Sequence, residues 1–422
     1  MNLGKYNRVF KNFLALFTLQ GLNYILPMVT VPYLTRVLGP ANYGKTIFAA
    51  SIIVYFQVIT DYGFGMSATR NISLNRENKE RVNEIFSAVI WIKLALTTLC
   101  FFVLLIMINS IPRLRGEYLL YLFTYLGVLG NALFPIWLFQ GLEEMKYITY
   151  LNVVIRVLYT ISIFIFIRST DQYTLLPLIS SLVNIIIGLV SLLVIFKKFN
   201  IRLKKTNLNT IKVELVDGWH LFVTSIFSNF VSNGGNLMIG ALLGDTMVGY
   251  YGAIDKITKS VIALFSPITT ALFPFINRRF KKSAREGIQE IKKLGILVTL
   301  GSCFVAAIMF FGSWILVRLL CGGAYVDYSD ILKIHAFWLV ASIVNNFLGI
   351  QLLIGMGQGK YYTRAFVVAG IITIGTQLLL VSPLSVFSIP TGMLIGEVVL
   401  TIIMIFIIKY KVLKIVDLDQ PI

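Results

Sequence analysis

The sequence predicts an all-α polytopic membrane protein, and three of its properties indicate that class. Of the 422 residues, 57% are hydrophobic and only 13% are charged, whereas about a quarter of the residues in an average soluble domain are charged. The mean hydropathy is +0.82. Apolar runs of about 20 residues recur along the whole chain between short polar loops, which is the pattern of helices that cross a bilayer.

Twelve apolar segments are long enough to span a membrane as helices. We expect them at 12–37, 42–66, 85–108, 117–139, 147–167, 173–196, 217–243, 248–275, 293–320, 331–354, 362–383 and 386–409. The basic stretch before the first segment resembles the start of a signal peptide. The apolar run that follows is too long for one and has no cleavage site, so we interpret it as an uncleaved first span. Loops of about 20 residues at most leave no room for a separate soluble domain.

Basic residues are divided unequally between the two sides that these spans define. The termini and alternate loops share one side, which carries 26 of the 37 Lys and Arg residues, and the other side carries seven. The positive-inside rule therefore places both termini in the cytoplasm. Most of the net charge of +18 comes from this asymmetry. It favours anionic lipid over nucleic acid as a partner, because the bases are scattered over several short loops.

The stretch from Gly39 to Thr46 matches the G-x-x-x-x-G-K-[ST] pattern of phosphate-binding loops. Such a loop follows a strand in an α/β sheet, whereas here a membrane helix precedes it. Pro40 also removes one backbone donor, and the predicted topology puts the stretch on the outer face, where ATP is absent. We therefore interpret it as a tight glycine turn between two spans, and we expect no nucleotide.

The same turn occurs again in the second half of the chain. Leu38-Gly39 and Gly44 correspond to Leu243-Gly244 and Gly249 with the same glycine spacing. A polar join near 201–216 separates six spans from six, so the two halves are expected to be parallel repeats about an axis along the membrane normal. We expect an N-terminal lobe at 1–200, a basic cytoplasmic linker at 201–216 and a C-terminal lobe at 217–422. Transporters bind their substrates in the cleft between such lobes.

Arg156 lies near the middle of the fifth expected span, where an arginine costs at least about 2.5 kcal/mol on insertion scales. Asn152, Tyr159 and Thr160 are three or four residues away along the helix, and Thr149 is seven residues away, two turns earlier. Together they form one polar stripe, which is typical of a helix face that lines an aqueous cavity. A structural salt bridge is the alternative.

The eighth span carries Asp255, Lys256 and Lys259. Asp255 and Lys259 are four residues apart and have the spacing to neutralise each other, which leaves Lys256 as a free base. Glu397 in the twelfth span is expected to pair with one of these bases or to carry a proton. Asp61, Asp255 and Glu397 are candidates for ion coupling.

Further polar residues lie near the expected cleft. The seventh span has Asn229, Asn233 and Asn236 on one helix face, where amides either join helices or bind sugar hydroxyls. Arg36, at the outer end of the first span, is either a cavity residue or an interfacial anchor.

The first span also carries Gln20, Asn23, Pro27 and Pro32, which favour a kinked helix that lines the cleft. His220 and His335 lack the neighbours of a metal site or triad, and the three cysteines have no metal spacing. No metal is expected.

Four stretches resemble the polysaccharide-transport branch of the multidrug/oligosaccharidyl-lipid/polysaccharide exporter superfamily, in particular the Wzx-type O-antigen flippases. They are "VPYLTRVLGPANYG" from Val31, "ITDYGFGMSATRNIS" from Ile59, "FPIWLFQGLEEMKYIT" from Phe134 and "DGWHLFVTSIFSN" from Asp217. The resemblance covers almost the whole chain. It rests on the order and spacing of these stretches, because no single one of them is decisive.

The resemblance implies a bacterial inner-membrane flippase, not an enzyme, that works without a cofactor. Its substrate would be an undecaprenyl-pyrophosphate-linked oligosaccharide, moved outward by alternating access of two lobes. The cationic cavity described for the family would be formed here by Arg156, Lys256 and Lys259. A polymerase and chain-length proteins of the same pathway are the partners it suggests, besides membrane lipids.

Two other functions are alternatives. A multidrug or lipid II exporter of the same superfamily is the first, but lipid II flippases usually have two more helices, and multidrug exporters favour acidic cavities. A membrane glycosyltransferase or polymerase is the second. Such enzymes commonly need a large external loop, whereas the longest outer loop here has about ten residues.

Overall fold

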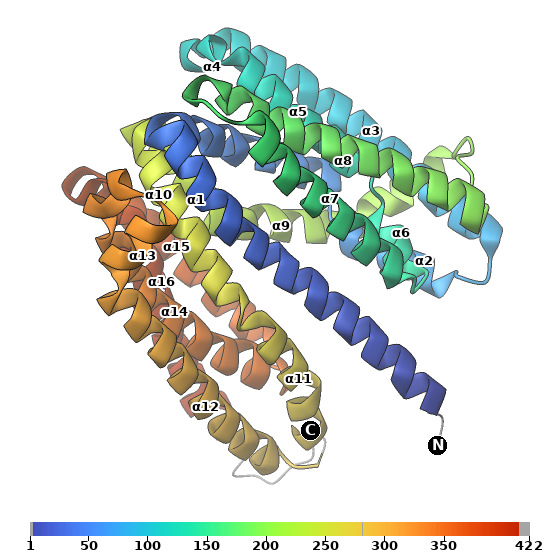
Figure 1. Ribbon diagram of the computed structural model, residues 1–422. Helices are drawn as coiled ribbons and strands as arrows, with labels where there is room; N and C mark the ends of the chain where they lie inside the picture. The colour runs from blue at the N-terminus through green and yellow to red at the C-terminus, as the bar shows by residue number, and fades with distance from the viewer. Residues whose placement is uncertain (1–2, 281, 413–422) are drawn as a thin grey trace. The chain divides into compact units, whose positions relative to one another are not determined.

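The computed structural model describes residues 3–280 and 282–412, and it describes side chains from residue 26 onward, except those of 27, 281 and 411–422. In these residues the secondary structure is entirely helical, without a strand (Figure 1). This confirms the predicted all-α class. The expected roles of Gln20, Asn23 and Pro27 lie outside the described side chains.

Contacts within the chain divide it into two compact units. Unit 1 comprises Met1–Leu26 and Val37–Gly240, and unit 2 comprises Pro27–Arg36 and Ala241–Ile422. Pro27–Arg36 thus belongs to unit 2, although the repeat assigns it to the N-terminal half. Helix α9 up to Gly240 belongs to unit 1, although the repeat assigns residues from 217 onward to the C-terminal half. The predicted lobes, 1–200 and 217–422, follow the repeat rather than these packing units, and they remain a prediction.

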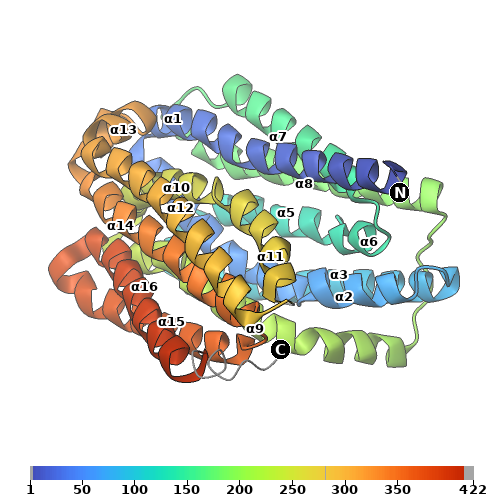
Figure 2. The same ribbon diagram turned by 90° about the horizontal axis from the view of Figure 1, so that it is seen from below.

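Unit 1 is a bundle in which α8 lies between α5 and α7 (Figures 1 and 2). Its helices are α1 (Leu3–Asp61, shared with unit 2), α2 (Phe64–Leu74), α3 (Lys79–Ser110), α4 (Pro112–Gly116), α5 (Tyr118–Ala132), α6 (Ile136–Gly141), α7 (Met145–Phe166), α8 (Leu175–Val194) and α9 (Leu208–Leu243). Short helical turns, η1 (Thr170–Thr174) and η2 (Ile195–Phe199), flank α8.

Unit 2 is built around α14, which packs against α12, α16 and α10. Its elements are α10 (Asp245–Ala263), α11 (Ser266–Phe280), α12 (Ala284–Phe311), α13 (Ser313–Leu320), η3 (Gly323–Tyr328), α14 (Asp330–Asn345), η4 (Asn346–Ile354), α15 (Gly359–Leu384), η5 (Ser385–Phe387), α16 (Ser388–Ile407) and η6 (Ile408–Val412). Helices α15 and α16 form an antiparallel pair beside α14 (Figure 2).

Each of the twelve expected spans coincides with helical structure, although only nine described segments are long and apolar enough to count as membrane spans. Two of the nine, Met28–Leu74 and Gly359–Tyr410, each contain two expected spans or their parts. Helix α9 is not among the nine, because polar residues interrupt it. A multi-pass membrane protein is therefore shown, and the count of twelve remains a prediction.

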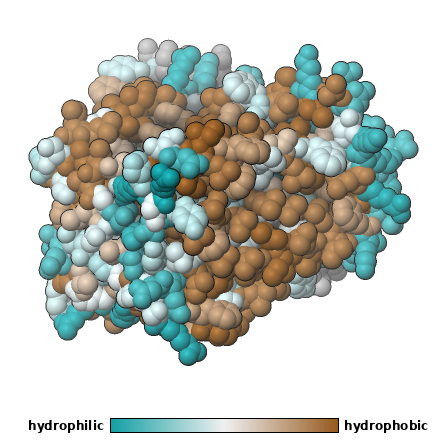
Figure 3. Space-filling view, turned by 90° about the horizontal axis from the view of Figure 1, so that it is seen from above, coloured by the Kyte–Doolittle hydropathy of each residue, from teal (hydrophilic) through white to brown (hydrophobic). Residues whose placement is uncertain are grey.

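Apolar side chains also cover the outside of the helices. Four residues of α7 that share one face, Val154, Leu158, Ile161 and Ile165, are each at least 44% exposed. Apolar (brown) side chains occupy much of the face drawn in Figure 3. Exposed apolar surface on this scale indicates a lipid-facing protein.

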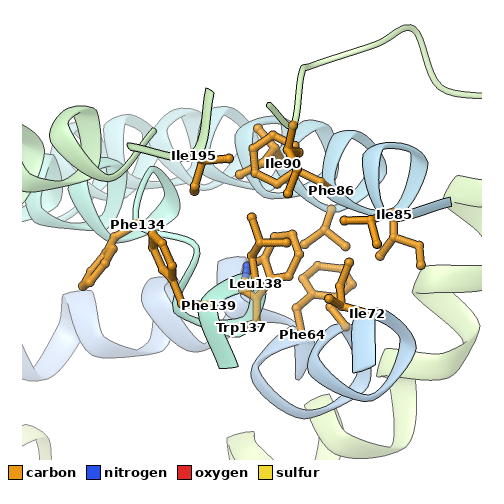
Figure 4. Packing of buried hydrophobic residues seen from close by; sticks show 14 of the residues in the cluster. Phe64, Ile72, Ile85, Phe86, Ile90, Phe134, Trp137, Leu138, Phe139 and Ile195 are labelled. Carbon is orange, nitrogen blue, oxygen red and sulfur yellow. The ribbon is translucent and has the colours of Figure 1, made fainter. Parts of the chain in front are cut away.

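The apolar core of unit 1 joins α2, α3, α6 and the end of α8. Phe64, Phe86, Leu138, Phe139 and Ile195 are fully buried in it, and their side chains converge in Figure 4. Two stretches that carry the resemblance, from Ile59 and from Phe134, thus supply core residues. Their first role is to hold these helices together.

The repeated glycine turn has the same backbone conformation in both halves. Gly39 has φ 69° and ψ 170° and interrupts α1, and Gly244 has φ 92° and ψ 175° immediately before α10. Only glycine adopts this region readily. A Cβ at either position would meet no atom within 4 Å, so the requirement for glycine comes from the backbone and not from packing.

We expect Gly39→Ala and Gly244→Ala each to lower the free energy of unfolding by about 1–3 kcal/mol, because alanine is strained at this φ and ψ. Gly301→Ala is the matched control, since Gly301 lies within α12, has equally open surroundings and has an ordinary helical backbone. Thermal unfolding in detergent measures all three. Equal stability of Gly39→Ala and Gly301→Ala would contradict the explanation.

Candidate cation site on helix α10

Helix α10 exposes two lysines on an otherwise buried stretch. Eight of the ten residues from 251 to 260 are buried, and the exceptions are Lys256, which is exposed, and Lys259, whose side chain is 36% exposed. The two lysines are three residues apart and therefore lie on neighbouring positions of one helix face. A lysine in a membrane span is costly against lipid, so this face requires water or an anion.

The predicted pair of Asp255 and Lys259 is present. The Lys259 Nζ atom lies 2.9 Å from Asp255 Oδ2, and the carboxylate side chain is only 5% exposed. The second carboxylate oxygen, Oδ1, is buried and accepts no hydrogen bond from the described residues. Lys256 forms no ion pair with any described side chain and remains the free base that the sequence predicted.

His335 of α14 lies behind this pair and is completely buried. Its Nδ1 atom is 3.1 Å from the Thr258 hydroxyl, and its ring packs near Tyr251 and Trp338. It joins α14 to α10, as a structural histidine does. His220, on α9, is exposed.

Glu397 of α16 has a different partner from the one expected. Its carboxylate accepts a hydrogen bond from the Asn345 side-chain amide. The Asn345 amide also donates to the Glu397 carbonyl, at 2.9 Å, and Thr401 donates to Asn345 Oδ1, at 2.7 Å. Glu397 is thus bonded to Asn345 rather than to a base of α10, and this network ties α14 to α16. The alternative, that Glu397 carries a proton, remains a prediction.

Arg156 is half-buried on α7, and its position is opposite the exposed apolar face of that helix. It follows Val154 by two residues, which is about 200° around a helix. Asn152 and Thr149 share its side of the helix and bond to the carbonyls one turn earlier. The guanidinium therefore points away from the face that the lipid covers.

The three asparagines of α9 lie along one face, as their spacing predicted. Asn233 donates to Asn229 Oδ1 at 3.3 Å, and Asn229 donates to the Ser225 carbonyl. Among the described residues, Asn236 Oδ1 and the Tyr55 hydroxyl are buried without hydrogen-bond partners. Tyr55 comes from α1, and its oxygen would lie 3.7 Å from a Cβ at Gly234. Two buried oxygen atoms beside α9 thus have no hydrogen-bond partner among the described residues.

Arg36 caps a helix end within unit 2. Its guanidinium donates to the Leu319 carbonyl at 2.6 Å, at the end of α13, and to the Pro32 carbonyl at 3.0 Å. A cation at a helix C-terminus satisfies free carbonyls and opposes the negative end of the dipole. The structure thus gives Arg36 an anchoring contact. Its alternative as a cavity residue remains untested.

Lys93 is a charged residue that the sequence interpretation missed. It is 3% exposed in α3, and its Nζ atom lies 2.8 Å from Asp61 Oδ1, whose side chain is 42% exposed. A lysine within the apolar span 85–108 was itself the signal that could have revealed this pair. Asp61 is thus the counter-ion of a buried lysine.

The stretches from Ile59 and from Asp217 meet at one end of unit 1. The rings of Tyr62 and Phe222 stack at 4.8 Å, and a Cβ at Gly63 would lie 2.9 Å from the Gly218 carbonyl. The Asn71 amide lies 3.1–3.2 Å from both Glu214 oxygens. These contacts fasten α9 to α2.

Glu214 is fully buried in this cluster. Burial raises the pKa of the Glu214 carboxyl, and the nearby Asp217 carboxylate raises it further, against the hydrogen bonds from Asn71 and the charges of Arg81 and Arg70. The sequence interpretation did not single out Glu214, because it lies before the expected span.

The apparent phosphate-binding loop also has a structural role. Lys45 contacts Glu117 Oε1 at 2.6 Å, and Tyr173 donates to the other oxygen of the same carboxylate at 2.6 Å. Helix precedes and follows Gly39. The lysine of the motif thus joins α1 to the loops before α5 and α8.

The sequence matches the model of a known protein family. The model of the family described as "Polysaccharide biosynthesis protein" matches residues 9–280, more than half of the chain. This chain belongs to that family.

Two curated relatives are similar over most of their length, and both are named "Putative O-antigen transporter". The relative from Escherichia coli (strain K12) is 30% identical over 89% of this chain and 89% of its own. The relative from Shigella dysenteriae is 26% identical over 96% of this chain and all of its own.

Solved structures of membrane transporters share the fold. The lipid II flippase MurJ, in an inward closed conformation, matches with a TM-score of 0.69 at 15% identity over 95% of this chain and 87% of that chain. A multidrug resistance MATE family transporter, in an inward-facing conformation, matches with a TM-score of 0.68 at 14% identity over 94% of this chain and 98% of that chain. These likenesses confirm a MATE/flippase-like fold.

The ion pair of Lys93 and Asp61 should contribute to the stability of this protein. Asp61→Asn should lower the free energy of unfolding by about 2 kcal/mol, because it leaves a buried ammonium without its counter-ion; the partial exposure of Asp61 reduces the effect. Adding Lys93→Met should restore most of the stability. Thermal unfolding of the single and double variants measures this, and a double variant less stable than Asp61→Asn would contradict it.

Proposed function

We propose that this family member is a flippase, not an enzyme, that moves an undecaprenyl-pyrophosphate-linked oligosaccharide from the cytoplasmic to the periplasmic leaflet by alternating access. The family, the names of the two relatives and the transporter fold support a polysaccharide flippase. The diphosphate substrate, the direction and the inner-membrane location are parts of the proposal. So are the cytoplasmic termini, which the distribution of basic residues supports.

The observation that carries the proposal is the pair of exposed lysines on buried α10. A diphosphate bearing sugars cannot cross hydrocarbon unaided, because its charges and hydroxyls would lose their hydrogen bonds to water. Lys256 and Lys259 can replace that water with charge-assisted hydrogen bonds. Their position in a membrane span is what a carrier of anions needs, whereas a hydrophobic cation would be repelled.

Arg156 and four asparagines of unit 1 are proposed as further substrate-binding residues. Arg156 faces away from lipid and supplies a third positive charge. Asn152, Asn229, Asn233 and Asn236 are proposed to bind sugar hydroxyls, and the unpartnered oxygens of Asn236 and Tyr55 are suitable for this purpose. No nucleotide, nucleic acid or cofactor takes part. Asp61, Asp255 and Glu397 remain candidates for ion coupling.

Lipid II or drug export is the second candidate, because the two structural neighbours carry out those functions. The basic α10 face argues against cationic drugs. The basic face does not distinguish lipid II from the oligosaccharide-linked lipid, because both carry a diphosphate. Export measured with each of the two headgroups decides between them.

We expect Lys256→Gln combined with Lys259→Gln to reduce export at least about a hundredfold, since each lost charge-assisted hydrogen bond is worth about tenfold. Surface polysaccharide in a strain that lacks its own flippase is the measurement. Lys292→Gln removes an exposed lysine of α12 and should leave export unchanged. Normal export by the double variant would refute the site.

Arg156→Gln should reduce export by about tenfold or more while membrane abundance stays constant, because the charge and not the packing is proposed to matter. Arg156→Lys should retain part of the activity. Val157→Ala, on the lipid side of the same helix, is the control. Loss of folded Arg156→Gln protein would favour a structural salt bridge instead.

A further inference from the structure

The two lysines of α10 differ in one respect that their spacing alone does not reveal. Lys259 has a buried carboxylate 2.9 Å from its ammonium, whereas Lys256 is exposed and forms no ion pair with a described side chain. Two cations on the same helix face are therefore unequal. Lys256 is available to an anion, whereas Lys259 is already neutralised by Asp255.

We propose that Asp255 is a positioning residue that competes with the substrate's diphosphate for Lys259 and thereby makes binding reversible. This inference rests on the proposed function. Lys256 then acts as the permanent anchor, and Lys259 exchanges between two anions: Asp255 in the empty carrier and a phosphate oxygen in the loaded one.

The geometry around Asp255 supports exchange rather than a shared contact. The carboxylate is 5% exposed, so a diphosphate cannot approach it closely, and two anions around one ammonium would repel each other at low dielectric. Lys259 is 36% exposed and carries the flexible stem that can swing outward. Movement of Lys259 alone therefore completes the exchange.

The surroundings of Asp255 also favour the return of Lys259. Tyr251, on the same helix, directs its hydroxyl to Met393 Sδ at 3.5 Å. Thr258 donates to the Ile254 carbonyl at 3.1 Å. His335 is the titratable residue that α14 presents, and its Nδ1 atom already contacts Thr258. Among the described residues, Lys259 is the only cation in an ion pair with Asp255.

A buried carboxylate that loses its counter-ion is strongly destabilised. The loaded state would therefore contain a bare Asp255, which draws Lys259 back and weakens the hold on the diphosphate. A carrier needs this, because a site made only of free cations would bind its load tightly and release it slowly. The Asp255 side chain thus sets the affinity without touching the substrate.

The test measures binding and release separately. The purified full-length chain in nanodiscs is titrated with undecaprenyl pyrophosphate, and headgroup transfer is followed in proteoliposomes. Asp255→Asn should bind about tenfold more tightly and transfer more slowly, so that KM and kcat fall together. Asp255→Glu, which keeps the charge, should restore part of the release. Asp255→Ser is a second neutral variant in case Asp255→Asn fails to fold.

A structural ion pair predicts the opposite result. If Asp255 only supports the fold, Asp255→Asn and Asp255→Ser will bind the diphosphate equally or more weakly, and the inference is overturned. The double variant Asp255→Asn with Lys259→Gln should lose the gain in affinity, because the freed lysine provides it.

Failure of the proposed function would look different. In that case the wild-type chain would not bind undecaprenyl pyrophosphate, and Lys256→Gln would change neither binding nor export. Binding by the wild type that depends on Lys256, without tighter binding by the neutral Asp255 variants, would leave the flippase standing and reject only the competition.

Discussion

The cost of placing charge in a bilayer governs this structure. A lysine or arginine within a span has to find a counter-ion, a carbonyl or water, and the described residues provide a counter-ion in one case and carbonyls in another. Lys93 is paired with Asp61, and Arg36 binds the carbonyls at the end of α13. Lys256 forms no ion pair with any described side chain. In a family described by polysaccharide biosynthesis, reversible binding of an anionic substrate best explains an exposed lysine within a span.

The stretches that resemble the exporter superfamily act mainly through packing. The stretch from Ile59 approaches the stretch from Asp217 so closely that only glycine fits at Gly63 and Gly218. A Cβ at Gly141, in the stretch from Phe134, would lie 2.6 Å from Ile72. Close backbone approach demands small residues at fixed positions, so these stretches contribute glycines that helix packing requires. The signature of a transporter family can thus be a signature of its helix contacts.

The fold class could be predicted from sequence because hydrophobic length is a local property. The same holds for the i, i+4 pair of Asp255 and Lys259 and for the single face of the α9 asparagines, which one helix determines by itself. Partners across helices could not be predicted: Glu397 was expected either to pair with a base or to carry a proton, and its partner across the helices is Asn345. Lys93 was missed although its position within an apolar span was a signal, and Glu214 was missed because it lies before the expected span. A period of 3.6 residues reveals which face a residue occupies but not which helix covers that face.

Asymmetry between similar charges is the property that turns a binding surface into a carrier. A uniform cationic surface would hold a diphosphate by several charge-assisted bonds at once, and release would have to break them all. When Asp255 neutralises Lys259, the affinity for the diphosphate falls. Recognition is kept, because Lys259 can still turn to a bound diphosphate. Burial makes this possible: an exposed carboxylate would be screened by water and would compete weakly. The low exposure of Asp255, rather than its mere proximity to Lys259, is therefore the feature that gives the pair a role beyond neutralisation.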